Sequence, residues 1–139
     1  MGCFARTIQV DCRGFTDVRD ITGEVEEAIR ASGLRAGAAL VSVPGSTAGV
    51  TTIEFEPGAV EDLKAAIARL APEGIPYAHD KRWGDGNGFS HVRAALLGPS
   101  LALPFREGRL AVGAWQQVVL VDFDNRPMKR TVEIMVVGE

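Results

Sequence analysis

The two histidines of the chain, His79 and His91, flank a short polar segment that contains three glycines, and Asp80 directly follows the first histidine. A glycine-rich segment can fold back on itself and bring both imidazoles into one pocket. A neutral imidazole serves as a metal ligand or a general base, and a neighbouring carboxylate can ligate the same ion or orient the ring. His79, Asp80 and His91 are therefore candidates for catalysis and for binding a divalent ion such as Zn²⁺ or Mg²⁺.

The same residues also allow a site without chemistry. Histidines beside a loop often only hydrogen-bond the backbone or solvent, and this spacing matches no standard zinc signature. In an extended backbone, His79 and Asp80 would point to opposite faces and could not bind one ion. Residues 84–88 lack the strand-to-helix setting and the spacing of a nucleotide-binding loop. The residues alone leave a functional and a structural role open.

Two further polar clusters interrupt apolar stretches. Ser46 and Thr47 lie in a turn over residues 44–49, where backbone N–H groups can bind an anion. An ordinary turn between two strands explains the same residues. Trp115 and Gln116 interrupt a β-rich pattern, and a buried glutamine needs a hydrogen-bond partner. One of them therefore lines a pocket or a subunit contact in this interpretation.

Composition narrows the class of protein. A chain of 139 residues with 46% hydrophobic and 24% charged residues fits a single globular domain, here residues 1–139. A net charge of −3 argues against general nucleic-acid binding. No apolar run approaches the roughly 18–20 residues of a membrane span, and no signal-peptide core follows the N-terminus. Cys3 and Cys12 lie too far apart on one predicted strand to form a disulfide, which fits a reducing cytoplasm.

The hydrophobic pattern predicts the elements that must position these residues. A helix capped by Asp20 or Thr22 is predicted to end near Gly33, with Val25, Ala28 and Ile29 at helical spacing. A second helix is predicted from Pro57 to about residue 70, and its apolar face consists of Val60, Leu63, Ile67 and Leu70. A short third helix is predicted over residues 91–97 with Ser90 as N-cap. Strands are predicted over residues 4–11, 38–43, 50–55, 100–103, 109–115, 117–123 and 131–137, with an irregular loop over 80–89. The predicted fold class is α+β, a β-sandwich of about seven mostly antiparallel strands with two helices and a short third helix. A parallel sheet is disfavoured, because the last four strands have no helices between them.

Four segments in combination resemble the YjbQ family, whose members are sometimes described as secondary thiamine-phosphate synthases. The segments are His79-Asp80, Gly86-Asn87-Gly88-Phe89-Ser90-His91-Val92, Leu97-Gly98-Pro99-Ser100-Leu101 and Gly113-Ala114-Trp115-Gln116-Gln117. The resemblance extends from the first strand to Glu139. It implies an α+β fold with a β-sandwich, a homotrimer, and a polar pocket with histidines near the subunit contacts, in some members with a bound metal.

The resemblance also assigns roles to individual residues. His79, Asp80 and His91 match the polar site of the family, and the positions that match its other motif residues are Ser90, Trp115, Gln116 and Glu54. The chain departs from the pattern at Gly45, where many members have a histidine before small hydroxyl residues, and at Ile53, where an asparagine is usual. With two histidines, an ion would need Asp80, Glu54, water or a neighbouring subunit.

Three functions are compatible with these residues. The first is a transferase of the thiamine-phosphate synthase type, with charge from Lys81, Arg82 and Arg93 and a metal on Asp80 and Asp85. The second is a protein that binds a small phosphorylated metabolite or another anion without turnover. Its predicted binding residues are Ser46, Thr47, Asn87, Ser90, Arg93, Trp115 and Gln116. The third is a trimeric structural protein in which the histidines only satisfy subunit contacts.

Overall fold

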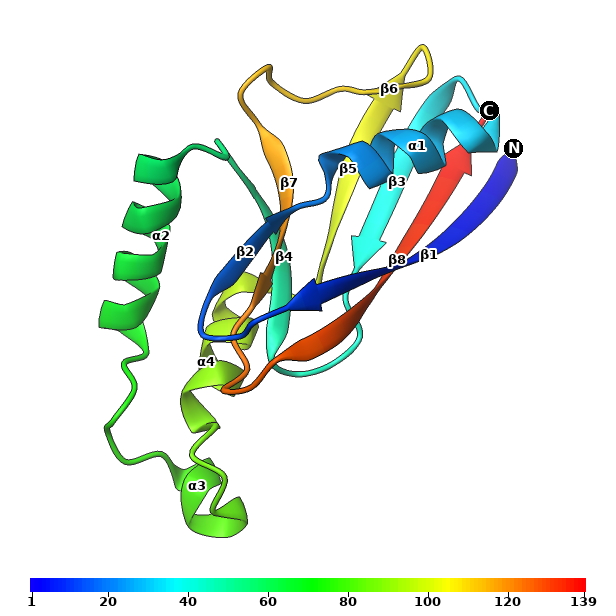
Figure 1. Cartoon of the computed structure of the whole chain (residues 1–139). Helices are drawn as coiled ribbons and strands as arrows, with labels where there is room; N and C mark the ends of the chain where they lie inside the picture. Colours follow the sequence, from blue (N-terminus) through cyan, green and yellow to red (C-terminus); the bar gives the residue numbers. More distant parts are fainter.

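The computed structural model describes residues 1–139, which form eight strands and four helices (Figure 1). In chain order these are β1 (Gly2–Cys12), β2 (Asp17–Asp20), α1 (Thr22–Ser32), β3 (Ala36–Ser42), β4 (Ala48–Ile53), α2 (Pro57–Leu70), α3 (Ala78–Trp83), α4 (Gly88–Leu97), β5 (Ser100–Arg106), β6 (Arg109–Leu110), β7 (Gln117–Asp122) and β8 (Met128–Gly138).

The strands form two antiparallel sheets. The large sheet has the order β1-β8-β3-β5-β6 and the small sheet the order β2-β7-β4. All strand pairings are antiparallel, and β1 pairs with β8 along its whole length, from Gly2 opposite Gly138 to Cys12 opposite Met128. The predicted α+β class with an antiparallel sandwich is confirmed.

The main core lies between the two sheets and α1. Alternation along β7 sends Val118 and Leu120 into this core, where Val41 and Ile134 of the large sheet meet them. Helix α1 adds the buried residues Val25, Ala28 and Ile29, the face predicted from their helical spacing. The core is built almost entirely from aliphatic side chains, as the low aromatic content requires.

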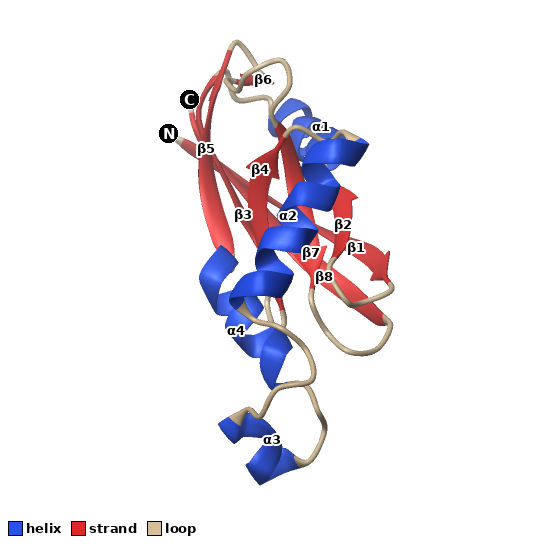
Figure 2. Cartoon of the chain, turned by 90° about the vertical axis from the view of Figure 1, so that its left-hand side faces the viewer, coloured by secondary structure: helices blue, strands red, loops and turns tan.

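A second core lies on the other face of the small sheet. Val119, Val121 and Phe123 point into it and pack against α2 and α4. Figure 2 shows these two helices on one side of the small sheet. Residue Ile67 is the buried anchor of α2, whereas Leu70 is 69% exposed and was wrongly predicted on the buried face. The second core therefore fixes α4, the helix that carries His91, to the sheet.

The structure differs from the prediction at several elements: β2 was not predicted, and the bounds of β4, β5 and β8 are shifted. Three further differences lie near the candidate residues. Residues 78–83 form α3 rather than an irregular loop, although no residue of this helix is buried, so hydrophobic periodicity could not reveal it. Helix α4 begins at Gly88, and Ser90 lies inside its first turn rather than at the N-cap. The predicted strand over 109–115 shrinks to β6, because residues 113–116 close a turn through a hydrogen bond from the Gln116 N–H to the Gly113 carbonyl.

The two cysteines lie on the continuous strand β1 and are both free, as predicted. Cys12 is 4% exposed, and burial raises the pKa of its thiol to about 11. A thiol with so high a pKa is almost entirely protonated near neutral pH, and it packs in the core rather than reacting. None of the four helices has the length and apolar character needed to cross a membrane.

The outer face of the large sheet carries a row of apolar side chains. The register places Ala5, Met135, Leu40 and Ala102 side by side on four neighbouring strands. Met135 and Leu40 are 39% and 42% exposed. We call these four residues the outer apolar row.

Candidate functional site

The two histidines come together where α3 folds back against α4. Their ring centroids are 4.3 Å apart, and the ring planes are tilted by 37°. His79 lies on α3 and His91 on α4, and the glycine-containing turn over residues 84–87 connects the two helices. The structure therefore places both imidazoles in one location, as the sequence predicts.

Two carboxylates contact the first imidazole. The Nδ1 atom of His79 lies 3.4 Å from Oδ1 of Asp80 and 3.3 Å from Oδ1 of Asp85. One potential ligand atom from each of the three residues falls within 4.8 Å of the others. His79 and Asp80 share this cluster because their backbone is helical, whereas an extended backbone would have separated them.

A close backbone approach holds the cluster in shape. The N–H of Gly88 donates to Oδ1 of Asp80 at 2.8 Å, which ties the start of α4 to α3. A Cβ atom at position 88 would lie 2.5 Å from Cβ of Tyr77, so this approach requires glycine. Tyr77 is fixed in turn by its hydroxyl, which donates to the Pro72 carbonyl at 2.6 Å. Sequence reasoning missed Tyr77 and the role of Gly88, because only the fold brings them together.

Asn87 and Ser90 are buried next to this cluster and bind other parts of the chain. The Ser90 hydroxyl donates to the Asn87 carbonyl at 2.7 Å and contacts the Asn87 side-chain oxygen. That oxygen also accepts from the backbone N–H of Asn125 at 3.1 Å. The two predicted binding residues therefore join α4 to the segment after β7, and the Ser90 hydroxyl and the Asn87 Oδ1 are used within the chain.

Arg93, another predicted anion ligand, is only 3% exposed. Its Nε donates to the Ala71 carbonyl at 2.9 Å, and Nη1 donates to the Thr16 hydroxyl at 3.0 Å. The guanidinium also lies over the ring of Phe89, 4.8 Å from the centroid. Burial lowers the pKa of Arg93, and the Glu73 carboxylate opposes this shift. Arg93 thus holds α4 to the end of α2 and to the β1–β2 turn.

The two hydroxyl residues of the turn over residues 44–49, Ser46 and Thr47, lie in different surroundings. Ser46 is exposed and lines a cavity of about 230 Å³ together with Gly45, Ala48 and His91. Thr47 is buried and belongs to a polar cluster beneath this turn, which also contains Asp122, Asp124 and Arg130. Of the predicted anion-binding pair, only Ser46 is open to a ligand.

The remaining predicted residues lie at the far end of the small sheet. In the β4–β7 register, Ala48 beside the His91 cavity pairs with Asp122, whereas Ile53 at the other end of β4 pairs with Gln117. Glu54 and Gln116 adjoin that second pair, and Figure 1 shows this end well separated from α3. The side chain of Gln116 donates to the Thr52 hydroxyl at 3.0 Å. Trp115 is 75% exposed. Within one chain, Glu54, Trp115 and Gln116 do not reach the histidines.

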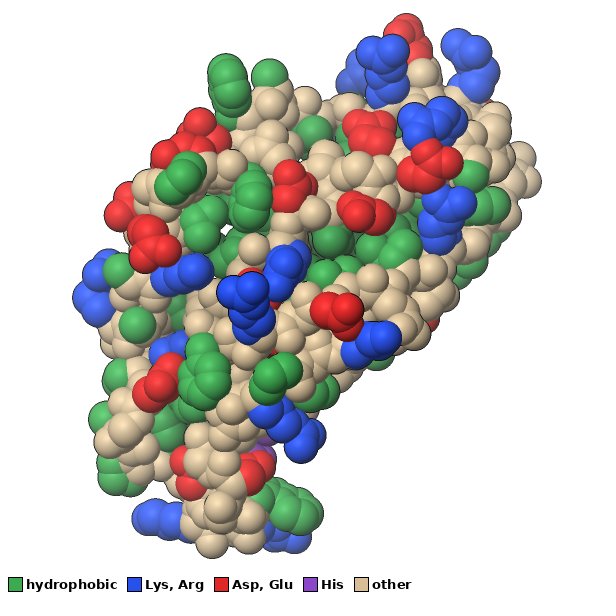
Figure 3. All heavy atoms as spheres, viewed as in Figure 1, with side chains coloured by type: hydrophobic (Ala, Val, Ile, Leu, Met, Phe, Trp, Pro, Cys, Tyr) green, Lys and Arg blue, Asp and Glu red, His purple; other side chains and the backbone are tan.

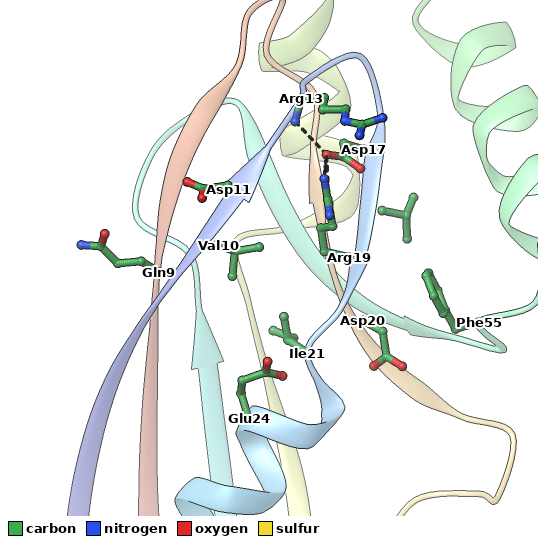
Figure 4. Close-up of a pocket in the computed structure, with 11 residues that line it drawn as sticks. Gln9, Val10, Asp11, Arg13, Asp17, Arg19, Asp20, Ile21, Glu24 and Phe55 are labelled. Carbon is green, nitrogen blue, oxygen red and sulfur yellow. Dashed lines mark hydrogen bonds and ion pairs between the residues drawn. The ribbon is translucent and has the colours of Figure 1, made fainter.

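The largest cavity, about 700 Å³, lies between β1, β2 and the start of α1 (Figure 4). Three of its charged side chains, those of Asp17, Arg19 and Asp20, make hydrogen bonds within the local structure. Asp17 accepts from the Arg13 N–H and from Arg19, and this bond raises the pKa of Arg19. Asp20 accepts from the backbone and the hydroxyl of Thr22. No histidine lines this cavity, so the candidate chemistry lies at the histidine cluster instead.

The histidine cluster reaches the surface. His79 is 28% exposed at its side chain and Asp85 is 47% exposed. Figure 3 shows histidine atoms next to acidic side chains near the lower end of the visible face. The same face carries acidic and basic side chains in alternation rather than one continuous charged surface. The cluster is thus a local acidic site that ions and small molecules can enter.

Comparisons with known proteins agree with the fold and with the motifs around this site. The model of the family described as UPF0047 protein YjbQ-like matches residues 6–139. UPF0047 protein YugU from Bacillus subtilis is 34% identical over 134 residues, which cover 96% of this chain and 98% of that protein. A UPF0047 protein from Archaeoglobus fulgidus is 34% identical over 116 residues, which cover 84% of this chain and 88% of that protein.

Solved structures give the same result. The crystal structure of a protein of unknown function from Sulfolobus solfataricus superposes with a TM-score of 0.93 at 30% identity, and 99% of each chain is covered. A hypothetical protein from Aeropyrum pernix superposes with a TM-score of 0.89 at 33% identity, covering 97% of this chain and 98% of that chain. The resemblance noted in the sequence is confirmed, and the chain belongs to the YjbQ-like UPF0047 family.

Proposed function

We propose that this protein binds a divalent metal ion of the Zn²⁺ type through His79, Asp80 and Asp85. The observation that carries the proposal is the pair of separations from His79 Nδ1 to the two carboxylate oxygens, 3.3 and 3.4 Å. Zn–N and Zn–O bonds of about 2.0–2.2 Å in a tetrahedron separate neighbouring ligand atoms by about 3.4 Å. Both separations from His79 Nδ1 therefore match neighbouring ligands of a zinc site, and the two carboxylates lie within 4.8 Å of each other.

The surroundings of the cluster fit such an ion. The Gly88 N–H orients the Asp80 carboxylate, as hydrogen bonds to metal ligands commonly do. Three protein ligands leave a fourth position for water or a ligand, the arrangement of catalytic rather than structural zinc sites. His91 packs on His79 and lines the adjoining cavity, so its imidazole can exchange a proton with a molecule bound there.

An enzymatic role would use the same residues. A transfer of the thiamine-phosphate synthase type, which the family resemblance implies, needs positive charge at the departing diphosphate. A bound divalent ion would supply Lewis acidity at this site. Lys81 and Arg82 extend from the last turn of α3 and would add charge, whereas Arg93 is occupied inside the fold. Turnover of the two thiamine precursors, measured with and without added metal, tests this extension.

A zinc titration by isothermal calorimetry tests the metal site. Wild-type protein is expected to bind one ion per chain, and His79→Ala is expected to weaken binding by at least about 100-fold because it removes the only nitrogen ligand of the cluster. Asp85→Asn is expected to weaken binding less, because an amide oxygen still coordinates. Asp62→Asn, on the exposed face of α2, is the matched control and should bind as wild type does.

A competing explanation predicts a different result. An ion pair between the His79 imidazole and the two carboxylates would bring the same atoms together without any metal. In that case the wild type would not bind zinc at millimolar concentration, while His79→Ala would still lower the melting temperature. That combination would reject the metal site.

We also propose that copies of the chain assemble as a homotrimer. The outer apolar row supports this, because no helix of the same chain covers these side chains and contiguous exposed apolar surface commonly marks a protein interface. Light scattering is expected to give three times the chain mass of 14.8 kDa. Met135→Lys should shift the protein to monomers, whereas Ala65→Lys, at an exposed position of α2, is the charge control. A monomeric wild type would reject assembly.

A further inference from the structure

Gly45 opens a space above a buried arginine. Its φ of +118° lies in the region that favours glycine, and a Cβ atom there would lie 3.2 Å from Nη1 of Arg130. Beyond the immediate chain neighbours of Gly45, no other heavy atom comes within 4 Å of that point. Gly45 also lines the cavity of about 230 Å³ that His91 borders. Arg130 does not itself line this cavity, so a ligand touches Arg130 only through an atom that enters the space at Gly45.

Arg130 has unused donors on the side of this space. The residue is 5% exposed, and its Nε and Nη2 donate to Oδ1 of Asp122 at 3.2 and 2.7 Å. Nη2 also donates to the Thr47 hydroxyl at 2.6 Å. None of these bonds uses Nη1. Only two side-chain polar atoms are fully buried without a hydrogen-bond partner, Asp122 Oδ2 and Asp124 Oδ1. Nη1 of Arg130 also has no partner but is not one of these, so it retains contact with solvent.

The charge around Arg130 selects the kind of group that can bind. Two carboxylates, Asp122 and Asp124, lie behind one guanidinium, at 2.7 and 3.8 Å from Nη2. Even with Asp122 protonated, the three residues carry no net positive charge. A phosphate dianion entering the cavity would meet the field of the carboxylates without a surplus cation. A neutral oxygen that accepts a hydrogen bond avoids this cost.

The rest of the cavity wall also favours a neutral group. Ala48, Ala94, Ala95 and Pro99 give it an apolar lining, while Ser46 and His91 add two polar groups at the edge. Small-molecule sites typically combine such an apolar wall with a few converging polar groups. A volume of about 230 Å³ suits a single small ring rather than a whole cofactor.

We infer that this cavity binds a neutral, carbonyl-bearing ring, such as a lactam, with its carbonyl oxygen accepting from Nη1 of Arg130 through the space that Gly45 leaves. The ring packs between the turn 44–49 and α4, beside His91. The inference does not depend on a metal at His79. It makes Arg130 the residue that recognises the neutral part of a small molecule.

NMR with 2-pyrrolidinone, a simple lactam, tests the inference in protein treated with EDTA. The lactam is expected to shift the Nε–H signal of Arg130 and the Ser46 amide signal in a saturable way at millimolar concentration. Gly45→Ala would block the space directly but strains the backbone at a positive φ. Ala95→Leu fills the cavity from α4 without that strain and is expected to weaken binding at least tenfold. Ala68→Leu, at an exposed position of α2, is the matched control.

Each other outcome rejects the inference. Saturable shifts of the Arg130 signal with inorganic phosphate or acetate, but not with the lactam, would assign an anion site instead. An Arg130 signal that does not respond to the lactam, or equal binding by wild type and Ala95→Leu, would show that the ring does not occupy this cavity. Because metal is absent throughout, these results are independent of the zinc titration.

Discussion

Replacement of Arg130 by alanine is expected to lower the free energy of unfolding by about 3–5 kcal/mol. Arg130 is the only cation that hydrogen-bonds the buried Asp122, which is 0% exposed, and Asp124 lies in the same cluster at 4% exposure. Without the guanidinium, Asp122 stays buried with no compensating cation, and Asp124 keeps only the exposed Arg126, whose Nε lies 3.7 Å from it. The Thr47 hydroxyl also loses a donor, although it still binds Asp124 at 2.8 Å.

The loss of unfolding free energy in Arg130→Ala should become smaller as the pH falls. Burial already raises the pKa of Asp122 above its usual range, and the Arg130 bond opposes this shift. Removing Arg130 raises that pKa further, so the folded variant holds a proton that the unfolded chain releases. An acid with a raised folded pKa gains stability as pH falls through that value. The difference between wild type and variant should therefore be smaller at about pH 5 than at about pH 8.

Urea unfolding at the two pH values measures this effect. Arg126→Ala is the control, because Arg126 is 73% exposed at its side chain and its Nε lies 3.7 Å from Asp124. That exposed pair should contribute less than about 1 kcal/mol. Equal losses in the two variants would mean that Arg130 does not neutralise the buried carboxylates.

Replacement of Arg93 by alanine is expected to lower the free energy of unfolding by about 2–4 kcal/mol. The change removes hydrogen bonds to Ala71 and Thr16 and the packing of the guanidinium on Phe89. Arg93→Lys should restore little of the loss, because one ammonium group cannot reproduce a planar group with several directed donors. Urea unfolding measures both variants.

This experiment also separates a structural role of Arg93 from the ligand role suggested by the sequence. Arg69→Ala, in the exposed last turn of α2, is the control and should change stability by less than about 0.5 kcal/mol. If Arg93→Ala left stability unchanged but abolished binding of inorganic phosphate, Arg93 would be a ligand-binding residue after all.

The sequence predicted the elements whose burial is periodic. Helix α1 with Val25, Ala28 and Ile29, the strand β1 and the antiparallel class all follow from alternation or helical spacing. The prediction failed at α3, which buries nothing, at the short strand β2, which was missed although Val18 is buried, and at residues 111–115, where β propensity yields to a turn. The periodic spacing of apolar residues reflects which side chains are buried. An element without buried residues, such as α3, therefore shows no periodic spacing.

The candidate site was predicted in part for a similar reason. The approach of His79 to His91 followed from a turn that reverses the chain, which is local information. The roles of Arg93 and Arg130 depend on partners distant in sequence, Thr16 for one and Asp122 with Thr47 for the other. A charged residue looks the same in a sequence whether it contacts a ligand or a buried partner. The sequence therefore could not tell these roles apart.

Helix α3 carries two of the three proposed metal ligands, yet none of its residues is buried. A segment with so little buried surface opens locally at low free-energy cost, and its amide hydrogens exchange quickly with solvent. Binding of the proposed ion at His79 would then also have to keep this segment closed, and the measured affinity would be the intrinsic affinity multiplied by the closed fraction. Substitutions that rigidify α3, far from any ligand atom, would thus strengthen binding without a new contact, and the ion would in turn slow amide exchange across the helix.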